Sequence, residues 1–307
     1  MRTCKLIFRN KMLKYLIAFF LILAANTEFQ PAAAQNKNTQ IRMPCGSGIV
    51  NYEHQSQYLV TNINAKSSFV HQVNIGPKGL RSGQLSLTFV GHSTFLIQSP
   101  ENIRVITDYN DYFRADVQPD IVTMDVEGGS HSTNLISPNI SYVLRGWTEA
   151  LTLQRHDVTL KDVRVYNLPT NITDFGAGFS NFSSVFIIQS QGLCIAHMGH
   201  LRHILDQQQL TDIGRIDVLL IPIDRLVTQS YDELIHNIKG INPRLIIPMH
   251  FDGMPTAKTF LGDISKVYTV KRFGTHTMML SRSTLPIKTE VLLLPPQRPG
   301  SKLGPRL

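Results

Sequence analysis

The sequence contains few cysteines and few charged residues. Only 3 of its 307 residues are cysteines, and Asp, Glu, Lys and Arg together make up 17%. A disulfide-rich miniprotein needs more cysteines in a shorter chain, and disordered chains and coiled coils need more charge than this. Because 42% of the residues are hydrophobic, the sequence predicts a folded globular protein with a well-filled core.

Two kinds of functional motif are also missing. The sequence has neither a Gly-x-Ser-x-Gly motif nor a Cys/His pair of recognisable spacing, so it offers no serine or cysteine nucleophile. After residue 34 it has no run of Lys and Arg and no basic stripe with interleaved aromatic residues. We therefore expect a small-molecule substrate and no nucleic-acid partner.

The positive charge is concentrated at the N-terminus. The formal net charge is +8, and five of the 30 Lys and Arg residues lie within the first 14 residues. An apolar run over residues 16–25 follows, and then a small-residue stretch that ends at Ala34. This order predicts a secretory signal peptide over residues 1–34, because an apolar run of about ten residues is short for a membrane span of roughly 20. Cleavage removes those five cations and one anion and leaves +4, so we expect a periplasmic or secreted protein without a stable membrane anchor.

Two cysteines remain after cleavage, because Cys4 lies within the predicted signal peptide. Cys45 and Cys194 could form one disulfide in an exported protein. Cys194, however, lies in the apolar stretch 192–196, which is typical of an unpaired, buried core residue. We therefore favour an unpaired Cys194.

The chain after the signal peptide divides by composition. Residues 35–82 are polar and predict an N-terminal extension, residues 83–294 form the main domain, and residues 295–307 form a flexible tail rich in Pro, Gly and basic residues. Strands are expected in the main domain at residues 85–90, 94–98, 103–107, 121–124, 141–144, 163–167, 184–189, 193–197, 218–222 and 245–249. Helices are expected at 205–213 and 231–239, between buried strands. The pattern predicts a mixed α/β fold.

Histidine is the most informative residue type. Six of the 11 histidines lie at the ends of the expected strands or in the loops that leave them, where α/β proteins usually build their sites. They are His92, His131, His197, His200, His203 and His250. A single histidine is usually a hydrogen-bonded core or surface residue, but a neutral imidazole at a strand end is also well suited to bind Zn²⁺. Their common placement favours a metal site.

Five segments, in this order, carry a family resemblance. They are Gly91-His-Ser-Thr-Phe-Leu-Ile97, Pro119-Asp-Ile-Val122, Gly192-Leu-Cys-Ile-Ala-His-Met-Gly-His-Leu-Arg-His203, Ile216-Asp-Val-Leu-Leu-Ile-Pro222 and Asn242-Pro-Arg-Leu-Ile-Ile-Pro-Met-His250. Together they resemble the metallo-β-lactamase superfamily, and more narrowly the branch with L-ascorbate-6-phosphate lactonase and many bacterial Zn-dependent hydrolases. The resemblance covers about residues 84–253. It implies an αββα sandwich with a metal site at one edge of its two sheets.

The chain departs from the family in its metal motifs. The first motif, His-x-His-x-Asp-His, is degenerate: a gapless count leaves only its last histidine, as His131, whereas a gapped alignment puts His131 at the middle histidine and Asn134 at the end. His200 stands where the family has a bridging Asp, and His250 matches the last ligand. Too few ligands remain for two metals. The resemblance therefore implies one Zn²⁺, bound by His131, His200 and His250 with a water.

The remaining candidate residues have supporting or catalytic roles. We expect His92, His197 and His203 to orient the ligands through hydrogen bonds. Ser130 stands where the family has the Asp that holds the nucleophilic water, so Glu127 and Asp252 are the candidate general bases by proximity, with Asp125 as a further one. Asp108 resembles the structural Asp of the family and is not assigned to the metal.

Two hypotheses from different classes remain. The first is an exported, mononuclear, metal-dependent hydrolase that acts on a small ester, lactone or phosphoester. The alternative is a non-catalytic relative that binds a ligand or partner through a degenerate cleft. The degenerate first motif favours the second hypothesis, and the three histidines at ligand-matching positions favour the first. Metal content separates them.

Overall fold

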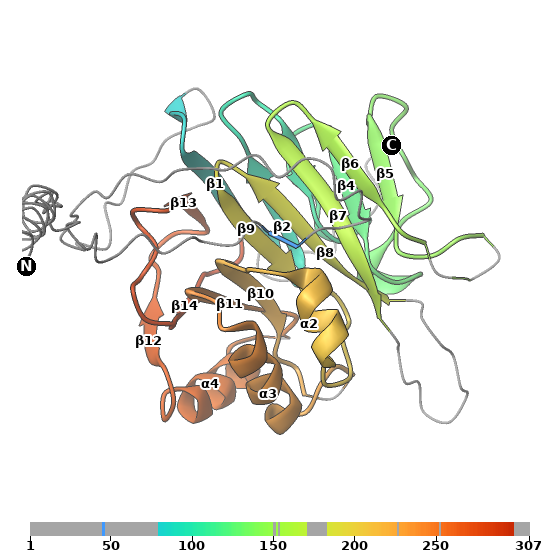
Figure 1. Ribbon diagram of the computed structural model, residues 1–307. Coiled ribbons are helices and arrows are strands. Elements are labelled where there is room, and N and C mark those ends of the chain that lie inside the picture. The colour runs from blue at the N-terminus through green and yellow to red at the C-terminus, as the bar shows by residue number, and fades with distance from the viewer. Residues whose placement is uncertain are drawn as a thin grey trace, which may run out of the picture. The chain divides into compact units, whose positions relative to one another are not determined.

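The computed structural model describes residues 45–46, 79–149, 152, 154–170, 183–225, 227–251 and 253–297 (Figure 1). The predicted signal peptide, most of the N-terminal extension and most of the C-terminal tail lie outside the described residues. Among the helices of the described part, none has the length and the apolar character needed to span a membrane.

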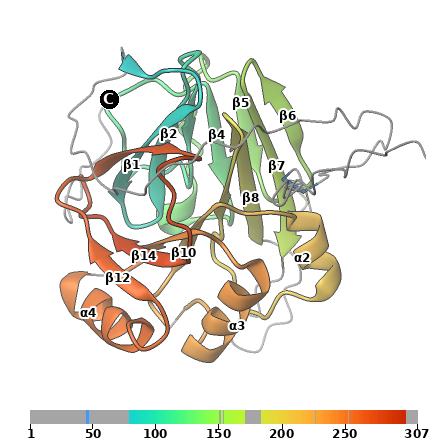
Figure 2. The same ribbon diagram turned by 60° about the vertical axis from the view of Figure 1, so that its left-hand side comes forward.

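The described strands form two sheets (Figures 1 and 2). The six-stranded sheet has the order β13 (Thr277–Ser281), β1 (Gln84–Gly91), β2 (Thr94–Gln98), β3 (Arg104–Ile106), β4 (Ile121–Met124) and β5 (Tyr142–Arg145). The eight-stranded sheet has the order β12 (Thr269–Arg272), β14 (Glu290–Leu293), β11 (Leu245–Met249), β10 (Val218–Pro222), β9 (Leu193–His197), β8 (Ser183–Ser190), β7 (Val163–Thr170) and β6 (Asp157–Leu160). β1, β2 and β3 form the expected antiparallel meander, whereas β3 pairs parallel with β4, and β9, β10 and β11 run parallel to one another.

The main core lies between the two sheets. In β1, Leu85, Leu87 and Phe89 alternate with Ser86 and Thr88 and pack into this core, as strand geometry requires. The central strand β10 is apolar at successive positions because both of its faces are buried: Leu220 packs between the sheets and Leu219 packs against the helices. The alternating and the continuous apolar runs of the sequence thus correspond to strands with one and two covered faces.

Three helices cover the outer face of the eight-stranded sheet (Figure 2). They are α2 (Gln207–Ile213), α3 (Tyr231–Ile241) and α4 (Gly253–Ile264). Helix α3 begins with a capping box, in which Ser230 and Glu233 accept each other's backbone N–H groups, and its apolar residues Leu234 and Ile238 face the sheet. The expected helices at 205–213 and 231–239 are confirmed within two residues at each end.

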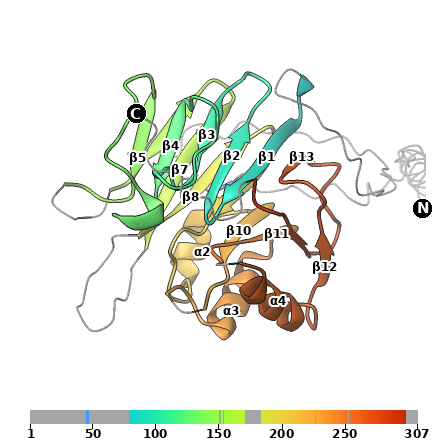
Figure 3. The same cartoon turned by 180° about the vertical axis from the view of Figure 1, so that it is seen from behind.

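The outer face of the six-stranded sheet is covered differently (Figure 3). Its buried residues, among them Val122, Met124 and Trp147, contact partly buried apolar residues of the loops at 109–118 and 132–140. No α-helix packs on this face in the described part of the chain. The predicted two-sheet sandwich is confirmed, with loops in place of one helical layer.

Cys45 and Cys194 form a disulfide, with their Cα atoms 5.7 Å apart. Both residues are buried, and Cys45 also forms an isolated backbone bridge with Gly214, just after α2. The prediction of an unpaired Cys194 is therefore wrong. A buried disulfide is as apolar as a buried thiol, so the apolar stretch 192–196 could not discriminate between the two states.

Candidate functional site

The site lies where several strands of both sheets end. Three of its residues follow a strand within two positions and have a left-handed backbone conformation: His92 after β1 (φ 53°), Asp108 after β3 (φ 43°) and His250 after β11 (φ 55°). Non-glycine residues rarely adopt a positive φ, and such residues concentrate at functional sites. His131 comes from the short 3-10 turn Gly129–His131 that follows β4. The strand ends thus place histidines from distant parts of the sequence side by side.

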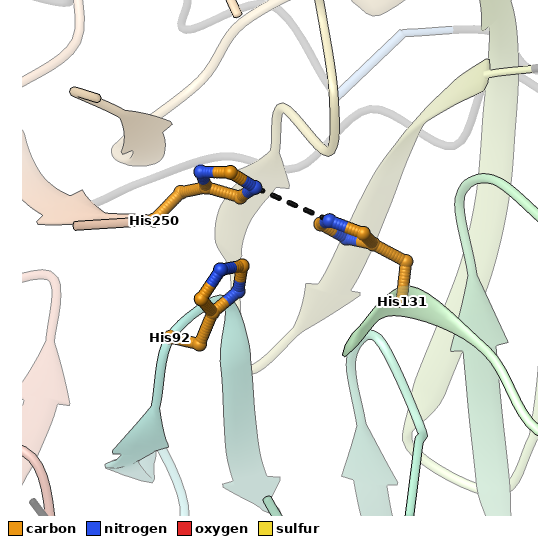
Figure 4. Close-up of side chains that lie close together, drawn as sticks. All are labelled: His92, His131 and His250. Carbon is orange, nitrogen blue, oxygen red and sulfur yellow. Dashed lines mark hydrogen bonds between the residues drawn. The ribbon is translucent and has the colours of Figure 1, made fainter. Parts of the chain in front are cut away.

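His131 and His250 face each other across the site (Figure 4). Their Nε2 atoms are 3.2 Å apart, and both residues are buried, at 7% and 6% exposure. His92 lies beside them, and one nitrogen from each of the three rings falls within 4.8 Å of the others. The three imidazoles therefore converge on one small volume.

Carboxyl groups contact the Nδ1 atoms of two of these rings, on the side away from the facing Nε2 atoms. His131 Nδ1 donates to Asp108 Oδ2 at 2.8 Å and lies 3.3 Å from Asp125 Oδ1. His250 Nδ1 donates to Asp224 Oδ2 at 3.1 Å. Because each Nδ1 is engaged in this way, each ring presents Nε2 to the other, as is usual for metal-binding histidines with a carboxylate partner.

The charges around His131 favour a cation. Burial alone would lower the pKa of His131, but the carboxylates of Asp125 and Asp108 outweigh it and raise this pKa to about 10. Burial and the nearby charge of Asp125 raise the pKa of Asp108, whereas His131 holds the pKa of Asp125 below its usual value in spite of burial. A positive charge between these carboxyl groups and His250 is thus stabilised, whether a proton or a metal ion supplies it.

His200 is the fourth histidine of the cluster. Its ring centroid lies 5.0 Å from that of His131 and 5.2 Å from that of His250, and burial lowers its pKa to about 4. Its backbone N–H donates to Asp125 Oδ2 at 2.6 Å. This approach requires Gly199 (φ +55°), because a Cβ there would lie 2.5 Å from Asp125 Oδ2. The His200 Nδ1 atom is buried and has no hydrogen-bond partner among the described residues, so it is free to accept a proton or a metal.

The other predicted residues take different positions. His92, expected to support the ligands, lies in the group of three; burial, followed by the charges of His250 and His131, lowers its pKa to about 2. His197 donates from Nε2 to the Ser93 carbonyl at 2.7 Å, which ties β9 to the turn after β1. The His203 carbonyl accepts a hydrogen bond from Asn237 at 2.9 Å. Glu127 is exposed in the loop after β4, and Asp252 lies outside the described residues.

Asp224 is the site residue that the sequence analysis missed. It follows β10, which was an expected strand, so a carboxylate at a strand end was the available indication. Thr228 donates a hydrogen bond to Asp224 Oδ1. Burial would raise the pKa of Asp224, but the hydrogen bonds from His250 and Thr228 lower it to about 2, so the carboxylate is charged.

Replacing Asp224 by Asn is expected to weaken metal binding about 10- to 100-fold, because the uncharged amide orients and polarises His250 less strongly. Competition with a chromophoric chelator would measure the change in Kd. Asp232→Asn, on the exposed first turn of α3, is the matched control and should leave the affinity unchanged. An Asp224→Asn protein with the affinity of the unmodified chain would contradict the role of this carboxylate.

The spacing of the His131 and His250 Nε2 atoms fits two ligands of one tetrahedral zinc ion. Zn–N bonds of about 2.0–2.1 Å place neighbouring ligand atoms about 3.3 Å apart in a tetrahedron, close to the 3.2 Å between the Nε2 atoms of His131 and His250. The rings of His92 and His200 are held neutral by burial, as a metal ligand must be. The residues present therefore match the group that the sequence resemblance implies.

Comparisons with known proteins find relatives in sequence and in fold. A metal-dependent hydrolase of Methanoculleus marisnigri is 25% identical over 203 residues, which cover 61% of this chain and 89% of that protein. A similar protein of Pelotomaculum thermopropionicum is 24% identical over 198 residues, covering 56% and 86% of the two chains. The crystal structure of a metallo-beta-lactamase superfamily protein from Thermotoga maritima matches with a TM-score of 0.52 and 24% identity, over 68% of this chain and 98% of that one.

A family model covers the segment that carries the site. The model, described as a beta-lactamase superfamily domain, matches residues 86–250. This match spans more than half of the chain and contains β1 to β11 together with all four histidines of the site. The chain therefore belongs to the metallo-β-lactamase superfamily.

Proposed function

We propose that this protein is a metal-dependent hydrolase with one Zn²⁺, and that its substrate is a small ester, lactone or phosphoester. The observation that carries the proposal is the 3.2 Å approach of the His131 and His250 Nε2 atoms, each backed by a carboxyl group on the opposite side of its ring. His92 and His200 would complete the donor set. Relatives named as metal-dependent hydrolases support the same activity.

The chemistry needs an activated water. A bound zinc ion lowers the pKa of its water to about 7 and so supplies a nucleophile at neutral pH. For an ester, the water oxygen bonds to the acyl carbon, the bond from that carbon to the leaving oxygen breaks, and the water proton ends on the leaving oxygen. Glu127 and Asp252 remain the proton acceptors predicted from sequence.

The place of action we propose is the periplasm or the extracellular space. The signal-peptide pattern over residues 1–34 supports export. The Cys45–Cys194 disulfide supports it independently, because disulfides persist in oxidising compartments. We propose no nucleic-acid partner and no membrane anchor after cleavage.

The alternative function is a non-catalytic protein that binds a ligand through the same cleft. The degenerate first motif favours it, since Val126, Gly128 and Ser130 stand at the family's ligand positions in a gapless count. Four clustered imidazoles, two of which have carboxyl partners, weigh against it.

Metal analysis and hydrolysis assays test the proposal together. We expect about one Zn²⁺ per purified chain, and cleavage of 4-nitrophenyl acetate, a simple lactone or bis(4-nitrophenyl) phosphate that a chelator abolishes and added Zn²⁺ restores. A metal-loaded protein that cleaves no ester, lactone or phosphoester would support the non-catalytic alternative. A protein without metal, whose thermal stability is indifferent to Zn²⁺ and chelator, would refute the metal site itself.

A further inference from the structure

Exposed apolar side chains gather on the loops that carry the site. The described residues include seven large hydrophobic side chains that are exposed, and five of these follow a site residue by three or four positions. These five are Tyr112, Leu135, Ile204, Val227 and Met254, which follow Asp108, His131, His200, Asp224 and His250 respectively. The other two, Val267 and Ile287, lie in the turns before β12 and β14. Isolated exposed apolar residues are common, but these five share the segments that follow the site residues.

One side of this apolar rim contacts the histidines directly. The ring of Phe113 stacks on the ring of His92, with 5.6 Å between centroids and 22° between planes. Asn110 Oδ1 accepts the backbone N–H groups of both Tyr112 and Phe113 at 2.8 Å, which fixes this turn against the end of β3. Tyr112, 47% exposed, is thereby held next to an aromatic ring that touches the site.

A second loop joins the same side. Thr133 Oγ1 donates to Asp111 Oδ2 at 2.7 Å and accepts the Leu135 backbone N–H at 2.9 Å. These bonds link the loop after β3 to the loop after His131, so Leu135, 58% exposed, lies close to the turn that carries Tyr112. The loops that carry Tyr112, Phe113 and Leu135 are therefore linked to each other, and Phe113 contacts His92.

Two further exposed apolar residues lie on segments connected to His250. Val227 belongs to the turn that the Thr228–Asp224 hydrogen bond closes, and Asp224 in turn accepts from His250. Met254 lies on the first turn of α4, four residues after His250. The segments that follow Asp224 and His250 thus also carry exposed apolar side chains.

Two cations of these loops take part in ion pairs. Arg114 forms an ion pair with Asp111 in its own turn. Arg225 pairs with Asp263 at 2.8 Å and lies over the ring of Tyr231. A phosphorylated substrate would need cations directed at its phosphate, and these two are committed elsewhere. The rim is instead suited to an uncharged, apolar group.

We propose that the rim formed by Tyr112, Phe113, Leu135, Val227 and Met254 binds the hydrocarbon part of the substrate, so that the substrate is an ester or lactone with an extended aliphatic chain. The proposal rests on the proposed function, because it takes the same site as the place of hydrolysis. It narrows the substrate class, since a polar phosphorylated lactone would gain nothing from five apolar side chains.

Alkyl hydroxamates provide a test that does not need turnover. These compounds chelate zinc, and we would measure by calorimetry the Kd of acetohydroxamate and octanohydroxamate for the Zn²⁺-loaded protein. Each fully buried methylene contributes about 0.8 kcal/mol, or about fourfold, and a half-exposed rim would retain part of this. We expect octanohydroxamate to bind at least about tenfold more tightly. Equal affinities would overturn the proposal.

Variants locate the effect. Leu135→Ser combined with Met254→Ser should reduce the octanohydroxamate advantage at least about threefold, and Val267→Ser combined with Ile287→Ser, the matched control outside the rim, should not. A reduction of the same size in both double variants would overturn the assignment to the rim.

Ester hydrolysis separates the two proposals. We expect KM to fall from 4-nitrophenyl acetate to the octanoate, in parallel with the hydroxamates. A chain-length effect on hydroxamate binding without any ester, lactone or phosphoester hydrolysis would refute the hydrolase and leave the apolar binding site standing. Hydrolysis with the same KM for all chain lengths, together with equal hydroxamate affinities, would refute the apolar site and leave the hydrolase standing.

Discussion

His250→Ala is expected to reduce bound zinc from about one ion per chain to less than about a tenth, and with it any metal-dependent hydrolysis. The His250 Nε2 atom lies 3.2 Å from that of His131, and Asp224 orients the His250 ring. Removing the ring therefore removes one of the nitrogen atoms proposed to bind the metal. His200→Ala should act in the same direction. Metal analysis by mass spectrometry after dialysis would measure the loss.

Thermal unfolding provides the second readout for this variant. Zinc at about 100 times its Kd stabilises a single-site protein by about 2.7 kcal/mol, which corresponds to a Tm increase of about 5–10 °C for a domain of this size. His250→Ala should lose this increase, whereas His236→Ala, at an exposed position on α3, should keep it. Full zinc occupancy and an unchanged zinc-dependent Tm in His250→Ala would contradict the assigned site.

Reduction of the Cys45–Cys194 disulfide is expected to lower the free energy of unfolding by about 2–5 kcal/mol. The bridge joins residues 149 positions apart, and chain-entropy arguments give long loops the upper part of this range. The measured consequence should be a fall in Tm of about 5–15 °C on adding dithiothreitol under unfolding conditions.

A double variant controls for effects of the reductant. Cys45→Ser combined with Cys194→Ser should unfold at the lower temperature with or without dithiothreitol. If the double variant unfolds at the temperature of the oxidised protein, the bridge does not stabilise the fold.

Most of the strands could be predicted because a buried strand face requires apolar residues at regular positions in the sequence. β1 alternates, and β10 and β11 are short apolar runs with both faces covered. The sequence did not predict α4, whose first turn, Gly253-Met-Pro255, has the composition of a loop, although Pro is compatible with a first helical turn. The strand β12, with mostly half-exposed residues, lacks an apolar pattern that could have identified it.

The site was predictable only in part. His131, His200 and His250 were recognisable as histidines after apolar strands, and the structure brings their rings together. The partnership of Asp224 with His250 and that of Cys45 with Cys194 depend on which strand lies beside which. Sequence spacing does not encode such neighbours, so they required the three-dimensional structure.

Strand β9 links the covalent and the metal-binding features of the molecule. It carries Cys194 and ends at His197, and the turn that follows presents His200 to Asp125. Oxidation of the chain and assembly of the zinc site therefore involve the same strand. For the exported zinc protein that we propose, the order in which oxidant and metal reach the chain becomes a variable of its maturation, because zinc supplied before oxidation would meet a site whose supporting strand is not yet tethered.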